Sequence, residues 1–222
     1  MSVRVVAVDI GSIRPPSNFA WAAFDAPGRA VAAEGDSPET AVSALLAGFQ
    51  EDRQVALLLE SPVSVPVPPV QHDSWRTLGA ARDGEGNRPW SAGAGSAALA
   101  TGLAQGAWML LSLAAAIPGL TVTTQPRRWR GGHARLLLAE AFVSGAGKPP
   151  PLPAGQHAAD AAAVALALLA RLDTAGEITS DVRCSPLHPF NLLAAMAIWA
   201  GLHIDGTEIR QDVLVIRCTP PT

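Results

Sequence analysis

Short apolar, β-branched runs alternate along the chain with longer segments rich in alanine and leucine, a pattern typical of α/β proteins. The clearest helix start is Ser37-Pro38-Glu39, where a capping serine precedes a proline at the first helical position and an acid. The run 134–143 fits a strand or a helix, and we favour a strand. Strands are predicted over residues 3–10, 18–25, 29–35, 55–60, 120–124, 134–143 and 212–218, and helices over 37–50, 96–117, 156–172 and 186–202.

Residues 62–95 interrupt this alternation with prolines, glycines, arginines and tryptophans that follow no sustained period. A stretch of that length is typical of a functional loop or of disorder, and its tryptophans favour an ordered binding loop. The chain of 222 residues is long for one ordinary domain and short for two. We therefore expect a single domain over 1–222, with a core over about 3–172, an insertion at 62–95 and a C-terminal helix–strand extension at 173–222.

The composition narrows the class of protein. Apolar residues make up 49% of the chain and charged residues 16%, which excludes a disordered protein. The longest apolar run, 97–120, is broken by polar residues and a proline, so we expect a buried helix there and no membrane span. Strand-like residues begin at Val3 without a secretory leader, and the two cysteines form no zinc motif, so the expected location is the cytoplasm.

Positive charge gathers in the middle of the chain although the net charge is −3. From residue 76 to 135 there are seven arginines and two acids, with tryptophans interspersed. Arginines mixed with indole rings suit contacts with phosphates and stacked bases, whereas the alternative is a solvated loop whose tryptophans cover the core. The candidate substrate-binding residues are Trp75, Arg76, Arg82, Arg88 and Trp90.

Three acids occupy positions where acids are unexpected. Asp9 ends the first apolar strand, Glu60 ends the 55–60 strand, and Asp160 lies near the start of an alanine-rich helix. His157 precedes Asp160 by one helical turn, so both side chains share a helix face. Because strands in this order are commonly adjacent, their carboxyl ends and the helix start are expected to bring the three acids together.

Three carboxylates in one semi-buried site repel one another unless cations neutralise them. Mg²⁺ or Mn²⁺ is the expected cofactor, because these ions take carboxylate oxygens and keep waters for a phosphate substrate. Each acid also has a structural explanation: Asp9 in holding the following turn, Glu60 as a solvated strand end, and Asp160 in favouring the helix dipole. His157 alone is more often a cap or a surface histidine than a ligand.

Three short motifs carry a family resemblance: VDIGS at 8–12, LLLES at 57–61 and HAADAAAVAL at 157–166. With the order of the predicted elements, they resemble the ribonuclease H-like superfamily, and within it the RuvC-type resolvases and related bacterial nucleases. The resemblance covers roughly residues 3–172. It implies a mixed five-stranded sheet flanked by helices, with Asp9, Glu60 and Asp160 as metal ligands and His157 as a fourth ligand or proton carrier.

We therefore predict a divalent-metal-dependent phosphodiester hydrolase, a nuclease that uses metal-activated water and has nucleic acid as its partner. A non-catalytic module of the same fold that binds a protein or a nucleic acid is the main alternative. A nucleotide phosphotransferase is disfavoured, because the chain has one D-x-G-S turn and no second phosphate motif. Glu140 is a second-tier site candidate if 134–143 is a strand, and His72 and Asp73 are weaker ones.

Overall fold

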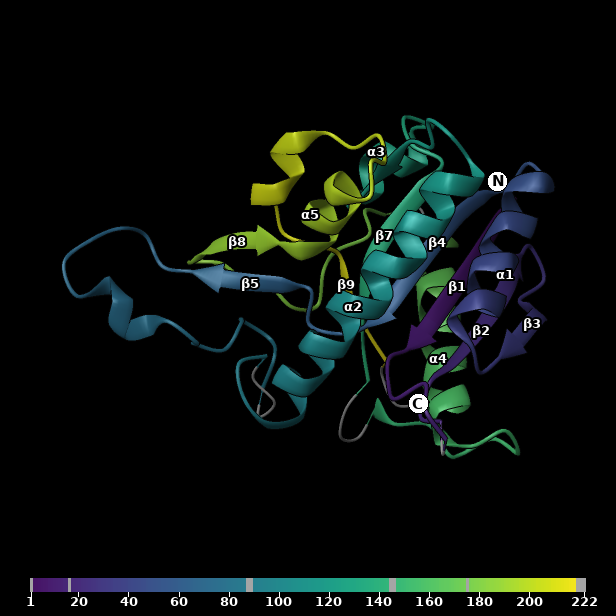
Figure 1. Cartoon of the computed structure of the whole chain (residues 1–222), viewed down its shortest axis with the longest axis horizontal. Coiled ribbons are helices and arrows are strands. Elements are labelled where there is room, and N and C mark those ends of the chain that lie inside the picture. Colours follow the sequence, from purple (N-terminus) through teal and green to yellow (C-terminus); the bar gives the residue numbers. More distant parts are fainter. Residues whose placement is uncertain (1, 16, 87–89, 144–146, 175, 219–222) are drawn as a thin grey trace.

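The computed structural model describes residues 2–15, 17–86, 90–143, 147–174 and 176–218, and it has a mixed seven-stranded sheet flanked by helices (Figure 1). The strand order is β3-β2-β1-β4-β7-β6, and β9 also pairs with β7. The strands of this sheet are β1 (Val3–Asp9), β2 (Ala20–Ala26), β3 (Ala30–Gly35), β4 (Gln54–Glu60), β6 (Val122–Thr123), β7 (Leu136–Phe142) and β9 (Val215–Arg217). The α-helices are α1 (Pro38–Gln50), α2 (Gly93–Ala116), α3 (Pro126–Arg130), α4 (Gln156–Leu172) and α5 (Leu192–Trp199).

The sheet combines an antiparallel meander with a parallel half. β1, β2 and β3 are antiparallel neighbours, whereas β1, β4 and β7 run parallel, and β6 and β9 are parallel to β7. Helices cover both faces of the central strands, which explains why these strands read as continuous apolar runs. The strands predicted over 3–10, 18–25, 29–35, 55–60 and 134–143 are therefore confirmed, with small shifts at their ends.

Side-chain alternation divides the core into two layers. In β1, Val6 and Val8 join the apolar cluster that includes buried residues of α1, α2 and α5. Val5 and Ala7 join the cluster on the opposite face, which α4 covers. In β4 the parity is reversed, so that the odd-numbered residues face α2 and the even-numbered residues face α4. This alternation decides which residues at the strand ends can meet.

Two helices, α1 and α4, lie where the sequence predicts them. α1 begins at Pro38, and the Ser37 hydroxyl accepts a hydrogen bond from the backbone N–H of Thr40 at 3.3 Å, as the capping pattern predicts. α4 spans the predicted 156–172. Gly155 precedes it with φ 101°, a conformation that other residues rarely adopt, which explains the glycine before this helix.

The C-terminal extension differs from the expectation. The helix predicted over 186–202 is wrong at its start, because His188–Asn191 forms β8 and the helix α5 begins at Leu192. The Asn191 side chain caps α5 by accepting from the N–H of Ala194. β9 adds to the main sheet beside β7, so the predicted five-stranded sheet is corrected to seven strands.

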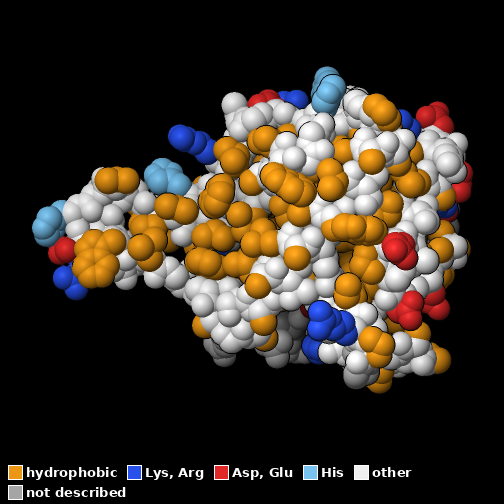
Figure 2. All heavy atoms as spheres, in the orientation of Figure 1, with side chains coloured by type: hydrophobic (Ala, Val, Ile, Leu, Met, Phe, Trp, Pro, Cys, Tyr) orange, Lys and Arg blue, Asp and Glu red, His pale blue; other side chains and the backbone are white. Residues whose placement is uncertain are grey.

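The insertion is partly regular and packs on the extension. β5 (Ser64–Val67) pairs with β8 in a two-stranded antiparallel sheet, and residues Asp83 and Arg183 form a further bridge. Beyond β5 the chain continues into an arm that projects from the body and carries the short 3-10 helix η1 (Ser74–Thr77) (Figures 1 and 2). The insertion and the extension thus pack together as one unit beside the main sheet.

α2 is buried on one side only, which corrects the expectation of a buried helix. Its buried residues are Gly102, Gly106, Met109, Leu110 and Leu113, whereas Trp108 and Leu111 are exposed. Figure 2 shows apolar side chains gathered over the face to which α2 and α5 contribute. α2 is long and apolar enough to cross a membrane, and 28% of its most apolar 18-residue stretch is buried. Core helices of soluble proteins share this length and composition, so these two properties alone do not indicate a membrane span.

Candidate metal centre

Asp9 and Glu60 are the last residues of adjacent parallel strands. They are direct partners in the β1–β4 register, and the alternation described above turns both side chains toward the α4 face. Gly11 follows Asp9 closely, and a Cβ there would lie 2.3 Å from the Asn18 carbonyl oxygen, so the VDIGS turn needs its glycine for a close backbone approach. The sheet therefore presents two carboxylates side by side at its edge.

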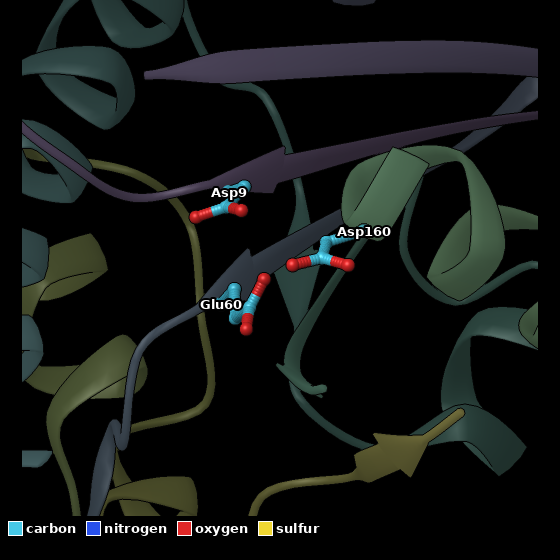
Figure 3. A group of neighbouring side chains, drawn as sticks. All are labelled: Asp9, Glu60 and Asp160. Carbon is cyan, nitrogen blue, oxygen red and sulfur yellow. The ribbon is translucent and has the colours of Figure 1, made fainter. Parts of the chain in front are cut away.

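Asp160 completes an acidic cluster with Asp9 and Glu60. Its side chain comes from the start of α4, and the three carboxylates point toward one another (Figure 3). One oxygen from each residue lies within 4.8 Å of the other two. Asp9 is 6% exposed and Asp160 is 1% exposed. The predicted meeting of these three acids is therefore observed in the fold.

Neighbouring side chains already contact two of the three carboxylates. His157 Nδ1 lies 2.8 Å from Asp9 Oδ2, so the predicted position of His157 beside the acids is also observed. Gln156 Nε2 donates to Asp160 Oδ1 at 2.6 Å, and Lys148 Nζ lies 3.3 Å from Asp160 Oδ2. Glu60 Oε2 is buried and has no hydrogen-bond partner among the described residues.

The protonation equilibria reflect this crowding. Burial raises the pKa of Glu60 well above its usual range, and the charges of Asp9 and Asp160 add to the rise. Burial also raises the pKa of Asp9, although the hydrogen bond and charge of His157 oppose that rise. The negative charges of Asp9 and Glu60 are therefore costly without a compensating cation.

The donor set fits a hard divalent cation. An ion with metal–oxygen bonds near 2.1 Å holds opposite ligands roughly 4 Å apart, which small side-chain adjustments would reach from the observed spacing. The unpartnered Glu60 Oε2 is an oxygen that such an ion would satisfy. Burial and the nearby Glu60 and Asp160 charges raise the pKa of the Cys218 thiol to about 12, so the thiolate form is disfavoured in the ion-free protein. The available ligands are oxygens, as for Mg²⁺ or Mn²⁺.

Sequence reasoning missed Lys148 and Gln156. Lys148 is the single lysine of the chain and lies in the proline-rich connection before α4, where no helical or strand period indicates its direction. Gln156 is the first residue of α4, four positions before Asp160. Residues at this i, i+4 spacing lie on the same helix face, so the spacing could have indicated the contact between their side chains.

Glu140 lies outside the acidic cluster, although 134–143 is the strand that its candidacy required. Glu140 pairs with Leu59 in the β4–β7 register and shares Leu59's face of the sheet, opposite to α4. Arg82 donates to both of its carboxylate oxygens at 2.7 Å, and the N–H of Val63 donates to one of them. Glu140 is thus held by an arginine fork and is not available as a metal ligand.

Arg82 is therefore corrected from a substrate contact to a buried structural residue. It is 3% exposed and also donates to Glu85 Oε1 at 3.0 and 3.2 Å. Desolvation opposes its positive charge, but the two carboxylates outweigh it and raise the pKa of Arg82 further. The cluster of Arg82, Glu85 and Glu140 fastens the insertion to β7.

The other predicted substrate contacts are dispersed. Trp75 and Arg76 lie on η1 in the projecting arm, where the guanidinium of Arg76 stacks 4.9 Å from the centre of the Trp75 ring. His72 and Asp73 are exposed and directly precede η1 in the projecting arm, which points away from the ends of β1 and β4 (Figure 1). Trp90 is half-buried and lines a pocket that includes Glu60. Arg88 lies outside the described residues.

Comparisons with protein-family models, curated proteins and solved structures find no match to the chain. The chemistry of the acidic cluster is therefore what indicates a function for this protein.

Proposed function

We propose that this protein is a divalent-metal-dependent phosphodiester hydrolase that acts on nucleic acid and has a ribonuclease H-like fold. The observation that carries the proposal is the convergence of Asp9, Glu60 and Asp160 at the ends of β1 and β4 and the start of α4. The antiparallel meander followed by parallel strands in the order β3-β2-β1-β4-β7 supports the fold assignment, together with the motifs at 8–12, 57–61 and 157–166.

In this proposal Asp9, Glu60 and Asp160 hold Mg²⁺ or Mn²⁺. A bound ion of this kind lowers the pKa of a coordinated water and neutralises charge on a phosphate. His157, whose side chain is 43% exposed, contacts Asp9 through Nδ1 and has its other ring nitrogen for carrying a proton to or from solvent. Asp9 orients the imidazole through their 2.8 Å contact.

Lys148 and Gln156 support the third carboxylate. Gln156 fixes the orientation of Asp160 through Oδ1, and Lys148 contributes positive charge at Oδ2. The Lys148 side chain is 42% exposed, so its ammonium lies where an incoming phosphate would approach the cluster. This cation adds local positive charge beside the acidic cluster.

The test is hydrolysis of a panel of single-stranded, duplex and branched DNA and RNA with Mn²⁺ or Mg²⁺. We expect cleavage by the wild-type chain and a fall of about 10³-fold or more in Asp9→Asn, because the loss of a ligand removes several kcal/mol of charge stabilisation. Asp52→Asn, at an exposed turn, is the matched control and should retain activity. A panel that stays intact with both ions would contradict the proposal.

A non-catalytic module is the second candidate, favoured by one observation: His157 and Lys148 already engage two of the three carboxylates. On this alternative the acids form a structural network and need no ion. Calorimetric titration with Mn²⁺ separates the two functions. Saturable binding that Glu60→Gln weakens supports the hydrolase, whereas no binding, or binding that the substitution leaves unchanged, supports the module.

A further inference from the structure

A small pocket adjoins the acidic cluster on the side of the insertion. Its volume is about 130 Å³, and Glu60 belongs to both the pocket and the cluster. Most of the remaining wall is apolar and comes from Pro62, Trp90, Ala98 and Phe142. An apolar cavity of about 150 Å³ is large enough to hold a benzene ring, so this pocket has the size of a single aromatic ring.

The indole of Trp90 is held in place by the fold. Its Nε1 donates to the carbonyl oxygen of Ala80 at 2.9 Å, and the neighbouring Ser91 hydroxyl donates to the carbonyl oxygen of Gly79 at 2.7 Å. These bonds pin both ends of the segment between residues 79 and 91. The hydrogen bond satisfies the indole N–H, and Trp90 lines the pocket while half-buried, so the ring is a candidate surface for stacking.

The polar groups that line the pocket are already satisfied, apart from Glu60. All four carboxylate oxygens of Glu85 and Glu140 accept hydrogen bonds from Arg82 or, at Glu140 Oε2, also from the N–H of Val63. The Ser61 hydroxyl donates to the carbonyl oxygen of Ala98. The carboxylates repel a phosphate from the pocket, whereas a neutral ring meets no such repulsion.

We propose that this pocket receives one unpaired nucleobase of the nucleic acid whose phosphodiester lies at the metal centre. The inference rests on the proposed function and specifies its substrate as single-stranded, or as having a base turned out of the duplex. Recognition is by stacking on Trp90 and by shape, because no free hydrogen-bond donor side chain lines the pocket among the described residues. Stacking does not depend on the hydrogen-bonding edge of a base, so a pocket of this volume should accept either single-ring base, thymine or uracil.

The test compares the binding of two octamers, dT8 and an all-abasic strand with the same phosphates, with the RNA strand rU8 run in parallel. Affinities are measured by fluorescence anisotropy in Ca²⁺. In Ala98→Leu the larger side chain fills the pocket without removing a hydrogen bond, because the contact of Ala98 with Ser61 is through its carbonyl. Ala100→Leu, an exposed position on the same helix, is the matched control.

We expect Ala98→Leu to weaken binding of dT8 or rU8 by about 5- to 150-fold, the equivalent of one base–aromatic stack. Binding of the abasic strand should change by less than twofold, and Ala100→Leu should bind like the wild type. Trp90→Ala should repeat the loss and Trp90→Phe should restore most of it. This pair keeps the test decisive if Ala98→Leu fails to fold.

If Ala98→Leu binds dT8 and rU8 as tightly as Ala100→Leu does, and Trp90→Ala loses no affinity, the pocket does not bind a base. Metal-dependent cleavage by the wild type could still hold in that case. Absence of Mn²⁺-dependent cleavage by the wild type would instead count against the hydrolase. A wild-type chain that binds neither base-containing strand would overturn the pocket as well.

Discussion

At the residue scale, the position of each acid decides its chemistry. Asp9, Glu60 and Asp160 share one solvent-shielded space, and Glu60 keeps a buried oxygen without a partner among the described residues. Glu140 is fully buried, and Arg82 neutralises it by donating to both of its oxygens. Two glutamates of the same chain thus have different roles: Glu60 is a candidate metal ligand, whereas Glu140 is one partner of a buried ion pair.

The first prediction concerns Glu60 in the metal-free protein. Because burial and neighbouring charges raise the pKa of Glu60 in the folded state, folding favours its protonated form, and the cost to stability grows as the pH rises from the ordinary pKa of 4.5 to the raised pKa. Glu60→Gln, in EDTA, should therefore raise the unfolding temperature at pH 8 by a few degrees, since about 1 kcal/mol corresponds to roughly 2–4 °C in a chain of this size.

The gain should fade as the pH falls from the raised pKa toward the ordinary glutamate pKa of 4.5 and be absent below it, where the carboxyl is protonated in both folded and unfolded states. Thermal unfolding followed by circular dichroism at several pH values measures it. Glu34→Gln, on the exposed edge strand β3, is the control and should change little. A lower unfolding temperature for Glu60→Gln at pH 8 would show that this carboxylate stabilises the metal-free fold.

At the element scale, the insertion and the extension act together. β5 pairs with β8, β9 pairs with β7, and the Arg82–Glu85–Glu140 cluster fastens the insertion to β7 from inside the protein. The arm beyond β5 carries Trp75 and Arg76 at an exposed end. A buried ion-pair cluster therefore holds the segment that contains Trp90, which lines the same pocket as Glu60, Glu85 and Glu140.

The second prediction tests that cluster. Arg82→Met removes the cation and leaves two buried carboxylates unpaired, so the free energy of unfolding should fall by about 3–5 kcal/mol at neutral pH. Burial raises the pKa of Glu140, so protonation relieves the unpaired charge and the loss should shrink toward acidic pH. Chemical denaturation at pH 5 and pH 8 measures both effects.

The control for this prediction is Arg76→Met in the exposed arm, which should cost less than about 1 kcal/mol because exposed ion pairs contribute little. The double variant Arg82→Met with Glu140→Gln should recover part of the lost stability. If Arg82→Met were no more destabilising than Arg76→Met, the cluster would not fasten the insertion.

At the scale of the whole molecule, the carboxylates that could hold an ion come from parts of the chain that only folding brings together. The helices bury the sheet from both faces, and the start of α4 meets the ends of β1 and β4 across a long separation in sequence. An ion held by all three acids would therefore stabilise the folded chain over the unfolded one by mass action.

The third prediction is that Mn²⁺ raises the unfolding temperature of the wild-type chain at pH 8. At an ion concentration of 100 Kd the gain is about 2.7 kcal/mol, or several degrees. The shift should diminish at pH 5, because the raised pKa values of Asp9 and Glu60 mean that bound protons compete with the ion. Differential scanning calorimetry at the two pH values measures the shift.

In this experiment Asp160→Asn should lose most of the Mn²⁺ shift, and Asp52→Asn should keep it. An equal shift in all three proteins would indicate that the ion binds elsewhere on the chain.

The hydrophobic pattern of the sequence determined the central strands, α1 and α4. Burial imposes a period of two residues on a strand and of 3.6 residues on a helix, and both periods can be recognised in the sequence alone. It also placed Asp9, Glu60 and Asp160 at the matching ends of those elements. The 188–191 strand was not predictable, because proline and polar residues there follow no strand period and pair only with the distant β5. The fate of Glu140 depended on the face of the sheet and on Arg82, a partner far away in the chain. Local periodicity thus decided the elements and their terminal acids, whereas the partners of buried charges arose from long-range packing that a linear pattern does not encode.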